Sequence, residues 1–140
     1  MKLNRVVLAA ALIALAPVPG NPTAVRAQPQ GVTPSILLRT NVSGDEGKEA
    51  VIGFAEFAVG ATTGRHTHPG DEYATVLEGT LEIRVEGSEP RRVSAGEAYH
   101  NPKGIVHETR NVGEIPARVA GTFIIEKGRP LSEPAAERRQ

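Results

Sequence analysis

Cysteine is absent from this chain of 140 residues. Its absence excludes disulfide bonds, thiolate metal sites, cysteine nucleophiles and an anchor on a lipidated cysteine. Aromatic residues are scarce, at 4%, so we expect no pocket built on stacked rings and an interior of valine, isoleucine, leucine and alanine. An excess of charge is also lacking, because 16 basic residues balance 16 acidic ones. No nucleic-acid partner is therefore indicated.

Glycine and proline are plentiful, at 15 and 11 residues, and they indicate short strands joined by tight turns. The clearest strand is 80–86, where Leu81, Ile83 and Val85 alternate with charged residues. Sustained helical periodicity is confined to the N-terminal segment. A chain of this length forms one domain, and many closely spaced strands predict an all-β sandwich or barrel.

The first 27 residues predict a signal peptide. Lys2 and Arg5 precede an unbroken apolar run, Val6–Ala16, and Val25–Ala27 has small residues at the two positions that a signal peptidase reads. We therefore expect cleavage before Gln28 and an exported protein, periplasmic or secreted. A retained membrane anchor is the alternative, but the apolar run is short for a bilayer span. Cleavage would leave a mature net charge of −3, since three basic and no acidic residues depart.

The remaining chain divides by composition. Residues 28–34 are polar and rich in proline and glycine, which predicts a flexible lead-in. A first strand is expected at 35–40, and a loop at 41–48, where asparagine, serine, glycine and acidic residues gather. The folded domain is expected over 35–131. Residues 132–140 are polar and contain proline, so we expect a frayed tail.

Histidine and glutamate are placed as metal ligands. His66 and His68 are two residues apart, so on an extended strand both imidazoles point to one side. A Pro-Gly-Asp turn follows, and Glu72 begins the next strand. His107 lies downstream, just beyond a second turn at 102–104. Imidazole suits zinc, iron, copper and nickel, and the carboxylate adds an oxygen donor that also suits manganese.

The spacing around these donors resembles the cupin family, whose pattern has two motifs. In the first motif, the matching residues are Gly60, His66, His68, Glu72 and Gly79. In the second, they are Gly96, Pro102, Gly104, His107 and Asn111. Every gap agrees in both blocks, and the resemblance spans roughly Ser35 to Leu131. It implies a single-domain, all-β cupin fold: a double-stranded β-helix, or jelly-roll barrel.

The resemblance also implies a function. One divalent transition metal ion (iron, manganese, nickel, copper or zinc) is expected on His66, His68, Glu72 and His107, with coordination positions left open. We expect a metal-dependent enzyme of the dioxygenase, isomerase or decarboxylase type, acting on a small oxygen-bearing molecule. The alternative is an exported, non-catalytic module that captures a metal or small ligand. A storage protein is disfavoured because the ligand set is intact, and a homodimer is expected only by analogy.

Three other polar residues have two interpretations each. His100, the fourth histidine, is either a base beside the site or a residue on the outer face, and we favour the outer face. Tyr73 and Tyr99 each lie next to a motif residue. They either pack in the strands, which we favour, or donate a hydroxyl to a ligand.

The expected pocket wall is aliphatic. Ala74 and Val76 share strand parity with Glu72, so they are predicted to line the pocket. Such a wall offers few acids or bases besides Glu72 itself. Asn111 is interpreted as structural, as it usually is in cupins, and is not assigned to the metal.

Overall fold

The computed structural model describes residues 31–136. The predicted signal peptide therefore lies outside the described residues. The described chain forms ten strands and no helix. They are β1 (Val32–Val42), β2 (Asp45–Phe57), β3 (His66–Thr67), β4 (Gly70–Glu78), β5 (Thr80–Val85), β6 (Arg91–Ser94), β7 (Ala98–Asn101), β8 (His107–Asn111), β9 (Ala117–Glu126) and β10 (Glu133–Pro134).

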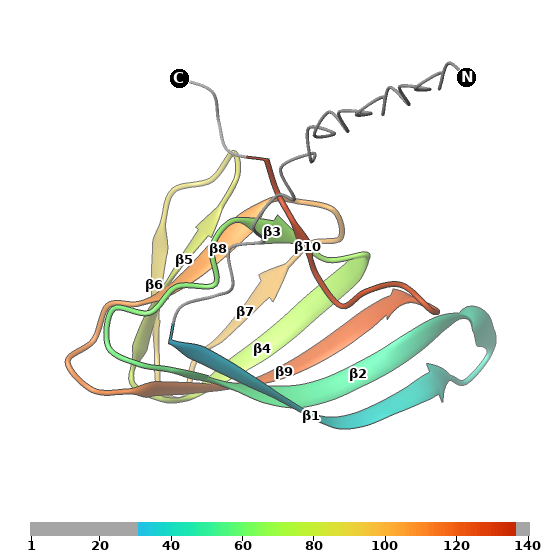
Figure 1. Ribbon diagram of the computed structural model, residues 1–140, viewed down its shortest axis with the longest axis horizontal. Coiled ribbons are helices and arrows are strands. Elements are labelled where there is room, and N and C mark those ends of the chain that lie inside the picture. The colour runs from blue at the N-terminus through green and yellow to red at the C-terminus, as the bar shows by residue number, and fades with distance from the viewer. Residues whose placement is uncertain (1–30, 137–140) are drawn as a thin grey trace, which may run out of the picture.

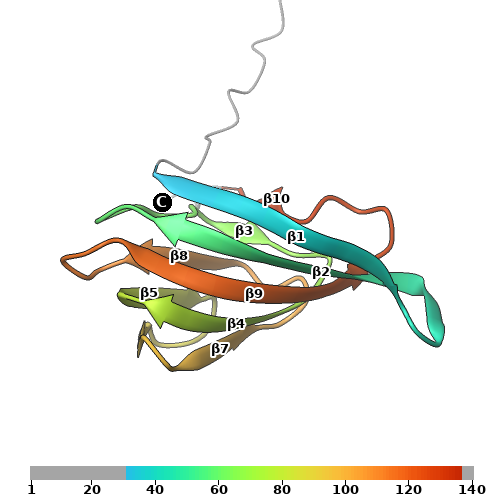
Figure 2. The ribbon, with the colours of Figure 1, turned by 90° about the horizontal axis from the view of Figure 1, so that it is seen from below.

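The strands form two five-stranded sheets that face each other. The larger sheet has the order β1-β2-β9-β4-β7, and the smaller one has the order β10-β3-β8-β5-β6; every pairing is antiparallel. Figure 1 shows the smaller sheet across from the larger one, and Figure 2 shows the larger sheet in its spatial order. This is the double-stranded β-helix expected from the sequence. Chain neighbours β4 and β5 lie in different sheets, so the chain crosses the barrel at Gly79.

One half of the barrel is closed by an apolar core. Leu81 and Ile83 of β5 are buried, whereas Glu82 and Arg84 face outward, as the alternation predicted. Val76 is also fully buried. The core cluster comprises Phe57, Ala61, Ala74, Val76, Leu81, Ile83, Val93, Tyr99, Ala117 and Val119. This packing fills one half of the barrel with apolar side chains.

The loop predicted at 41–48 is largely strand. β1 runs to Val42 and β2 begins at Asp45, so only Ser43 and Gly44 form the turn. Gly44 has φ +81°, which favours glycine. The polar composition predicted a loop, but this hairpin is exposed on both faces near its tip. Strands that face water on both sides tolerate polar residues.

The predicted frayed tail also contains a strand. Glu133 and Pro134 form β10 and pair with Thr67 and His66 of β3. The lead-in is likewise shorter than predicted, because β1 begins at Val32. Neither segment carries the alternating apolar pattern of a core strand. Their strands depend on pairing with partners distant in sequence, which composition does not reveal.

Asn111 and Gly79 have structural roles. The side-chain nitrogen Nδ2 of Asn111 donates to the carbonyl oxygens of Phe57, Ala58 and Ile115, and its side-chain oxygen accepts from the Gly113 amide. Asn111 thus joins three segments of the chain, as its structural interpretation predicted. Gly79 has φ +80°, and a Cβ there would lie 2.7 Å from Cβ of Ala117. Only glycine fits this crossing without displacing a neighbour.

Candidate metal centre

The four predicted donors come from both sheets and meet inside the barrel. His66 on β3 and His107 on β8 are register partners across one strand pair. His68 follows β3, and Glu72 lies on β4 of the opposite sheet. The inward parity predicted for His66 and His68 therefore holds. Ligating nitrogens of the three histidines lie within 4.8 Å of one another.

Glu72 completes the cluster from the facing sheet. Its Oε2 lies 3.4 Å from Nε2 of His68 and 3.6 Å from Nε2 of His107. Glu72, His68 and His107 are all buried, and His66 is partly exposed towards the cavity. The donors are therefore withdrawn from water, and the cluster has one accessible side.

Each imidazole is oriented by a main-chain carbonyl. Nδ1 of His66 bonds to the Gly64 oxygen at 2.9 Å, Nδ1 of His68 to the Leu131 oxygen at 2.6 Å, and Nδ1 of His107 to the Ile105 oxygen at 2.9 Å. A carbonyl only accepts, so each Nδ1 carries the proton. In the neutral ring, Nε2 is then left with a lone pair, which is the form that binds a metal.

The donors fit a metal ion. Within residues 31–136, Nε2 of His107 is buried and has no hydrogen-bond partner. Its lone pair and that of His68 Nε2 face a carboxylate oxygen at 3.6 and 3.4 Å, an arrangement of acceptors that repel one another. A cation among them would satisfy all of these atoms at once.

The electrostatics favour the metal-binding protonation states. Burial, followed by the charge of His66, lowers the pKa of His107 to about 4. Burial likewise lowers the pKa of His66. Burial acts to raise the pKa of Glu72, but the polar contacts of its carboxylate, among them the hydrogen bond from Asn101, hold it below its usual value. Neutral imidazoles and an ionised carboxylate at neutral pH are the forms that coordinate metal.

Asn101 was not predicted, and it holds Glu72. Its amide nitrogen donates to Glu72 Oε2 at 2.7 Å, and the residue is fully buried. The two residues are register partners on β7 and β4. In the sequence, Asn101 lies two residues after Tyr99 and therefore points to the same side of a strand. Its partner Glu72 could not be found from the sequence, because it lies 29 residues away on another strand.

Tyr99 is a second residue of the centre. Its side chain is buried among the donors, where burial and the Glu72 charge raise the pKa well above the usual value. Hydrogen bonding with Thr109 of the smaller sheet acts to lower this pKa, and hydrogen bonding with Glu72 acts to raise it. Tyr99 packs in the core, as favoured from the sequence, and it also lines the cavity beside the cluster. It stays protonated and can donate a hydrogen bond.

A cavity of about 560 Å³ opens onto the donors. It is lined by Val32, Pro34, Ala55, Phe57, Thr63, Gly64, Arg65, His66, Glu72, Tyr99, Glu108, Thr109, Val119, Phe123, Ser132, Pro134 and Ala135. The prediction of a wall at Ala74 and Val76 is wrong, because neither residue is among those that line the cavity and both pack in the core cluster. They share a face with Glu72 but lie further along β4. The expectation of an aliphatic pocket is also wrong, since three of the five aromatic residues line it.

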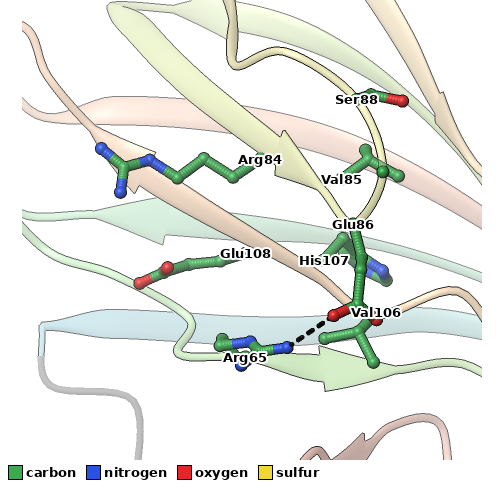
Figure 3. Close-up of a pocket in the computed structure, with 9 residues that line it drawn as sticks. Arg65, Arg84, Val85, Glu86, Ser88, Val106, His107 and Glu108 are labelled. Atoms are coloured by element: carbon green, nitrogen blue, oxygen red, sulfur yellow. Dashed lines mark hydrogen bonds and ion pairs between the residues drawn. The ribbon is translucent and has the colours of Figure 1, made fainter. Parts of the chain in front are cut away.

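A smaller cleft of about 250 Å³ lies behind the centre, and Figure 3 shows its lining. Arg65 pairs there with Glu86 at 3.2 Å, beside Arg84 and Glu108. Of the four donors, only His107 contributes to this lining. The larger cavity is therefore the route to the cluster.

His100 lies on the outer face of β7, as favoured from the sequence. Its Nε2 is 2.9 Å from Oδ1 of Asp71, and its ring stacks on Tyr73 with centroids 4.8 Å apart. Both His100 and Tyr73 are exposed. Neither reaches the donor cluster, which lies on the other face of the same sheet.

No helix within residues 31–136 has the length and apolar character needed to cross a membrane.

Known proteins support the fold and the family. A family model described as a cupin domain matches residues 53–126. The tetracenomycin polyketide synthase protein TcmJ of Streptomyces glaucescens is 36% identical over 90 residues, which cover 64% of this chain and 58% of that protein. Germin-like protein subfamily 2 member 1 of Arabidopsis thaliana is 36% identical over 73 residues, covering 49% of this chain and 33% of that protein. The chain thus spans less than two thirds of either relative.

Among solved structures, a recombinant oxalate oxidase in complex with glycolate superposes with a TM-score of 0.61 at 26% identity. The superposition covers 77% of this chain and 57% of that one. The family match from 53 to 126 contains both histidine-bearing segments of the sequence pattern. Together with the two-sheet barrel and its enclosed donors, these similarities establish that the chain belongs to the cupin family.

Proposed function

We propose that His66, His68, Glu72 and His107 hold one divalent transition metal ion, and that the protein is a metal-dependent enzyme acting on a small oxygen-bearing molecule. The observation that carries this proposal is the unsatisfied Nε2 of His107, which faces a carboxylate oxygen inside a buried cluster. Four protein donors leave positions open on a five- or six-coordinate ion, as catalytic sites require.

The substrate class follows from the cavity and from one relative. An oxalate oxidase with a similar fold binds glycolate, a small molecule with two oxygen donors. In this chain, the donor cluster lies at the end of a cavity whose remaining wall is largely apolar. We therefore propose a small organic acid or another chelating oxygen compound as the substrate.

The chain's own residues would position such a substrate. When bound, the metal would supply Lewis-acid or redox chemistry. Tyr99 lines the cavity and stays protonated, so it is placed to donate a hydrogen bond to a substrate oxygen. Asn101 fixes the carboxylate of Glu72 through one oxygen. Phe57, Val119 and Phe123 would exclude water from one side of the cavity.

Metal content tests the ligand set. Each of the four variants His66→Ala, His68→Ala, Glu72→Ala and His107→Ala is expected to lose most of the metal bound by natively purified protein. His100→Ala is the matched control, because it removes an imidazole from the outer face of the barrel. Loss of metal from His100→Ala with retention in His107→Ala would overturn the assignment.

Turnover separates an enzyme from a binding module. Metal-loaded and chelator-treated protein would be assayed in parallel with small organic acids, including oxalate and glycolate. We expect activity only with the ion. If the loaded protein binds these acids without converting them, the exported capture module is the correct function. Equal turnover with and without metal would show that the ion is only structural.

The proposal includes export and a homodimer. β1 lies at the edge of the larger sheet and exposes Ile36, Leu37 and Leu38 by 52%, 62% and 48%. A second copy would cover this apolar edge, and sedimentation velocity would report the dimer. Replacing Leu37 and Leu38 by lysine should give a monomer with unchanged metal content. A monomeric wild-type protein would contradict the dimer.

A further inference from the structure

The segment Leu131–Ala135, here called the C-terminal strap, lies along the strand that carries His66. Its residues Glu133 and Pro134 pair with Thr67 and His66, and Figure 1 shows β10 beside β3. The Ala135 amide donates to the Arg65 carbonyl at 3.0 Å. The strap thus forms the edge of the smaller sheet next to the candidate metal centre.

The strap touches the centre directly. The Leu131 carbonyl accepts the hydrogen bond from His68 Nδ1 at 2.6 Å, the shortest of the three histidine contacts. These two residues are 63 positions apart in the chain. Ser132, Pro134 and Ala135 form part of the cavity lining. The strap therefore orients His68 and also lines the cavity that leads to the cluster.

The strap is held by few interactions. Proline at 134 has no amide hydrogen to donate, and β10 is only two residues long. Glu133 pairs with Arg129 at 2.7 Å, but both side chains are nearly half exposed, and such a pair contributes at most about 1 kcal/mol. Segments with few buried contacts open at a small fraction of the cost of global unfolding. Opening of the strap is therefore accessible to the folded protein.

We propose that the C-terminal strap controls both the affinity of the metal centre and access to it. By holding His68 it strengthens ion binding, and by opening and closing it sets the rate at which ions and ligands exchange with solvent. The inference rests on the proposed metal site and adds control of access to it. It assigns a function to a segment that the sequence predicted to be frayed.

A reducible disulfide between β3 and β10 tests whether opening of the strap controls the exchange of metal ions with solvent. Thr67 and Glu133 are opposed in antiparallel strands, where Cα atoms lie about 4.5–5.5 Å apart, a span that suits a disulfide. The chain has no cysteine of its own, so the double variant T67C/E133C can form only this bridge within one molecule. Position 67 alternates with His66 and His68, so the bridge lies outside the cavity.

The measurement is the rate of Zn²⁺ transfer from loaded protein to an excess of chelator. We expect the oxidised double variant to release Zn²⁺ at least tenfold more slowly than the wild type, and reductant to restore the wild-type rate. T67C and E133C alone, blocked with an alkylating reagent, are the controls. Equal release rates from the oxidised and reduced double variant would overturn the inference.

Two proline variants test whether the strap strengthens metal binding through His68. Ala135→Pro removes the amide that donates to Arg65, whereas Ala136→Pro changes the next, exposed residue. We expect Ala135→Pro to weaken Zn²⁺ binding about tenfold and speed its release, and Ala136→Pro to match the wild type. Thermal unfolding without metal checks that both fold. If the wild type binds no Zn²⁺, the proposed metal site fails; if all three bind and exchange Zn²⁺ alike, the strap inference alone fails.

Discussion

Acid should destabilise the metal-free protein through His107. Burial lowers the pKa of this imidazole to about 4, whereas an unfolded histidine has a pKa near 6.5. Between these values the unfolded chain binds more protons than the folded chain, so the free energy of unfolding falls as pH falls. Integrating this difference from pH 7.5 to pH 5 gives a loss of about 2 kcal/mol. The lowered pKa of His66 acts in the same direction.

The assay is urea unfolding of chelator-treated protein at several pH values between 7.5 and 5. His107→Gln cannot take up this proton, so its stability should fall by about 2 kcal/mol less over the same range. His100→Gln is the control, because it removes a histidine outside the barrel and should leave the fall in stability that comes from the buried cluster. A flat profile for the wild type would refute the buried, neutral cluster on which the metal site depends.

Three further predictions address other features. Tyr99→Phe should keep the metal content but lower turnover about tenfold, the cost of one lost hydrogen bond of about 1.4 kcal/mol; unchanged turnover would leave Tyr99 a packing residue. Gly79→Ala should destabilise by about 1–3 kcal/mol more than Gly87→Ala in chemical denaturation, because both have φ near +80° but only at Gly79 does the added Cβ meet Ala117; equal losses would exclude the steric cost. N-terminal sequencing of exported protein should begin at or near Gln28, and an intact Met1 would contradict cleavage.

The resemblance of the two motifs to the cupin family predicted the fold and the four donors that the structure brings together. Alternation across β5 fixed which residues face the core, and the parity of His66 and His68 fixed their shared side. The outer face was favoured for His100 and is confirmed, but strand parity did not decide it, because a proline turn separates His100 from His107. The side to which a strand residue points depends on local geometry, because side chains alternate between the two faces of a strand. That the four donors hold an ion stays a prediction.

Features that depend on pairing between distant segments were not predictable in this way. Asn101 reaches Glu72 only because β7 and β4 pair in one register. Ala74 shares a face with Glu72, yet the closing of the barrel places it in the core. The strap at Glu133 and Pro134 has no apolar period, and its strand exists only through contact with β3. Composition at 41–48 indicated a loop because it cannot distinguish an exposed hairpin from an irregular segment.

The main-chain carbonyls that receive the three Nδ1 protons have a consequence for how such a site tolerates sequence change. A side-chain partner for each histidine could be lost by a single substitution, but every residue type supplies a carbonyl. Residues 105 and 131 can therefore vary in identity while the imidazoles keep their orientation, provided the backbone path is kept, whereas the φ of +67° at Gly64 favours glycine there. Insertions or deletions near these positions should damage the centre more than substitutions do. Loop length, more than loop composition, is then the property that selection would preserve around this cluster.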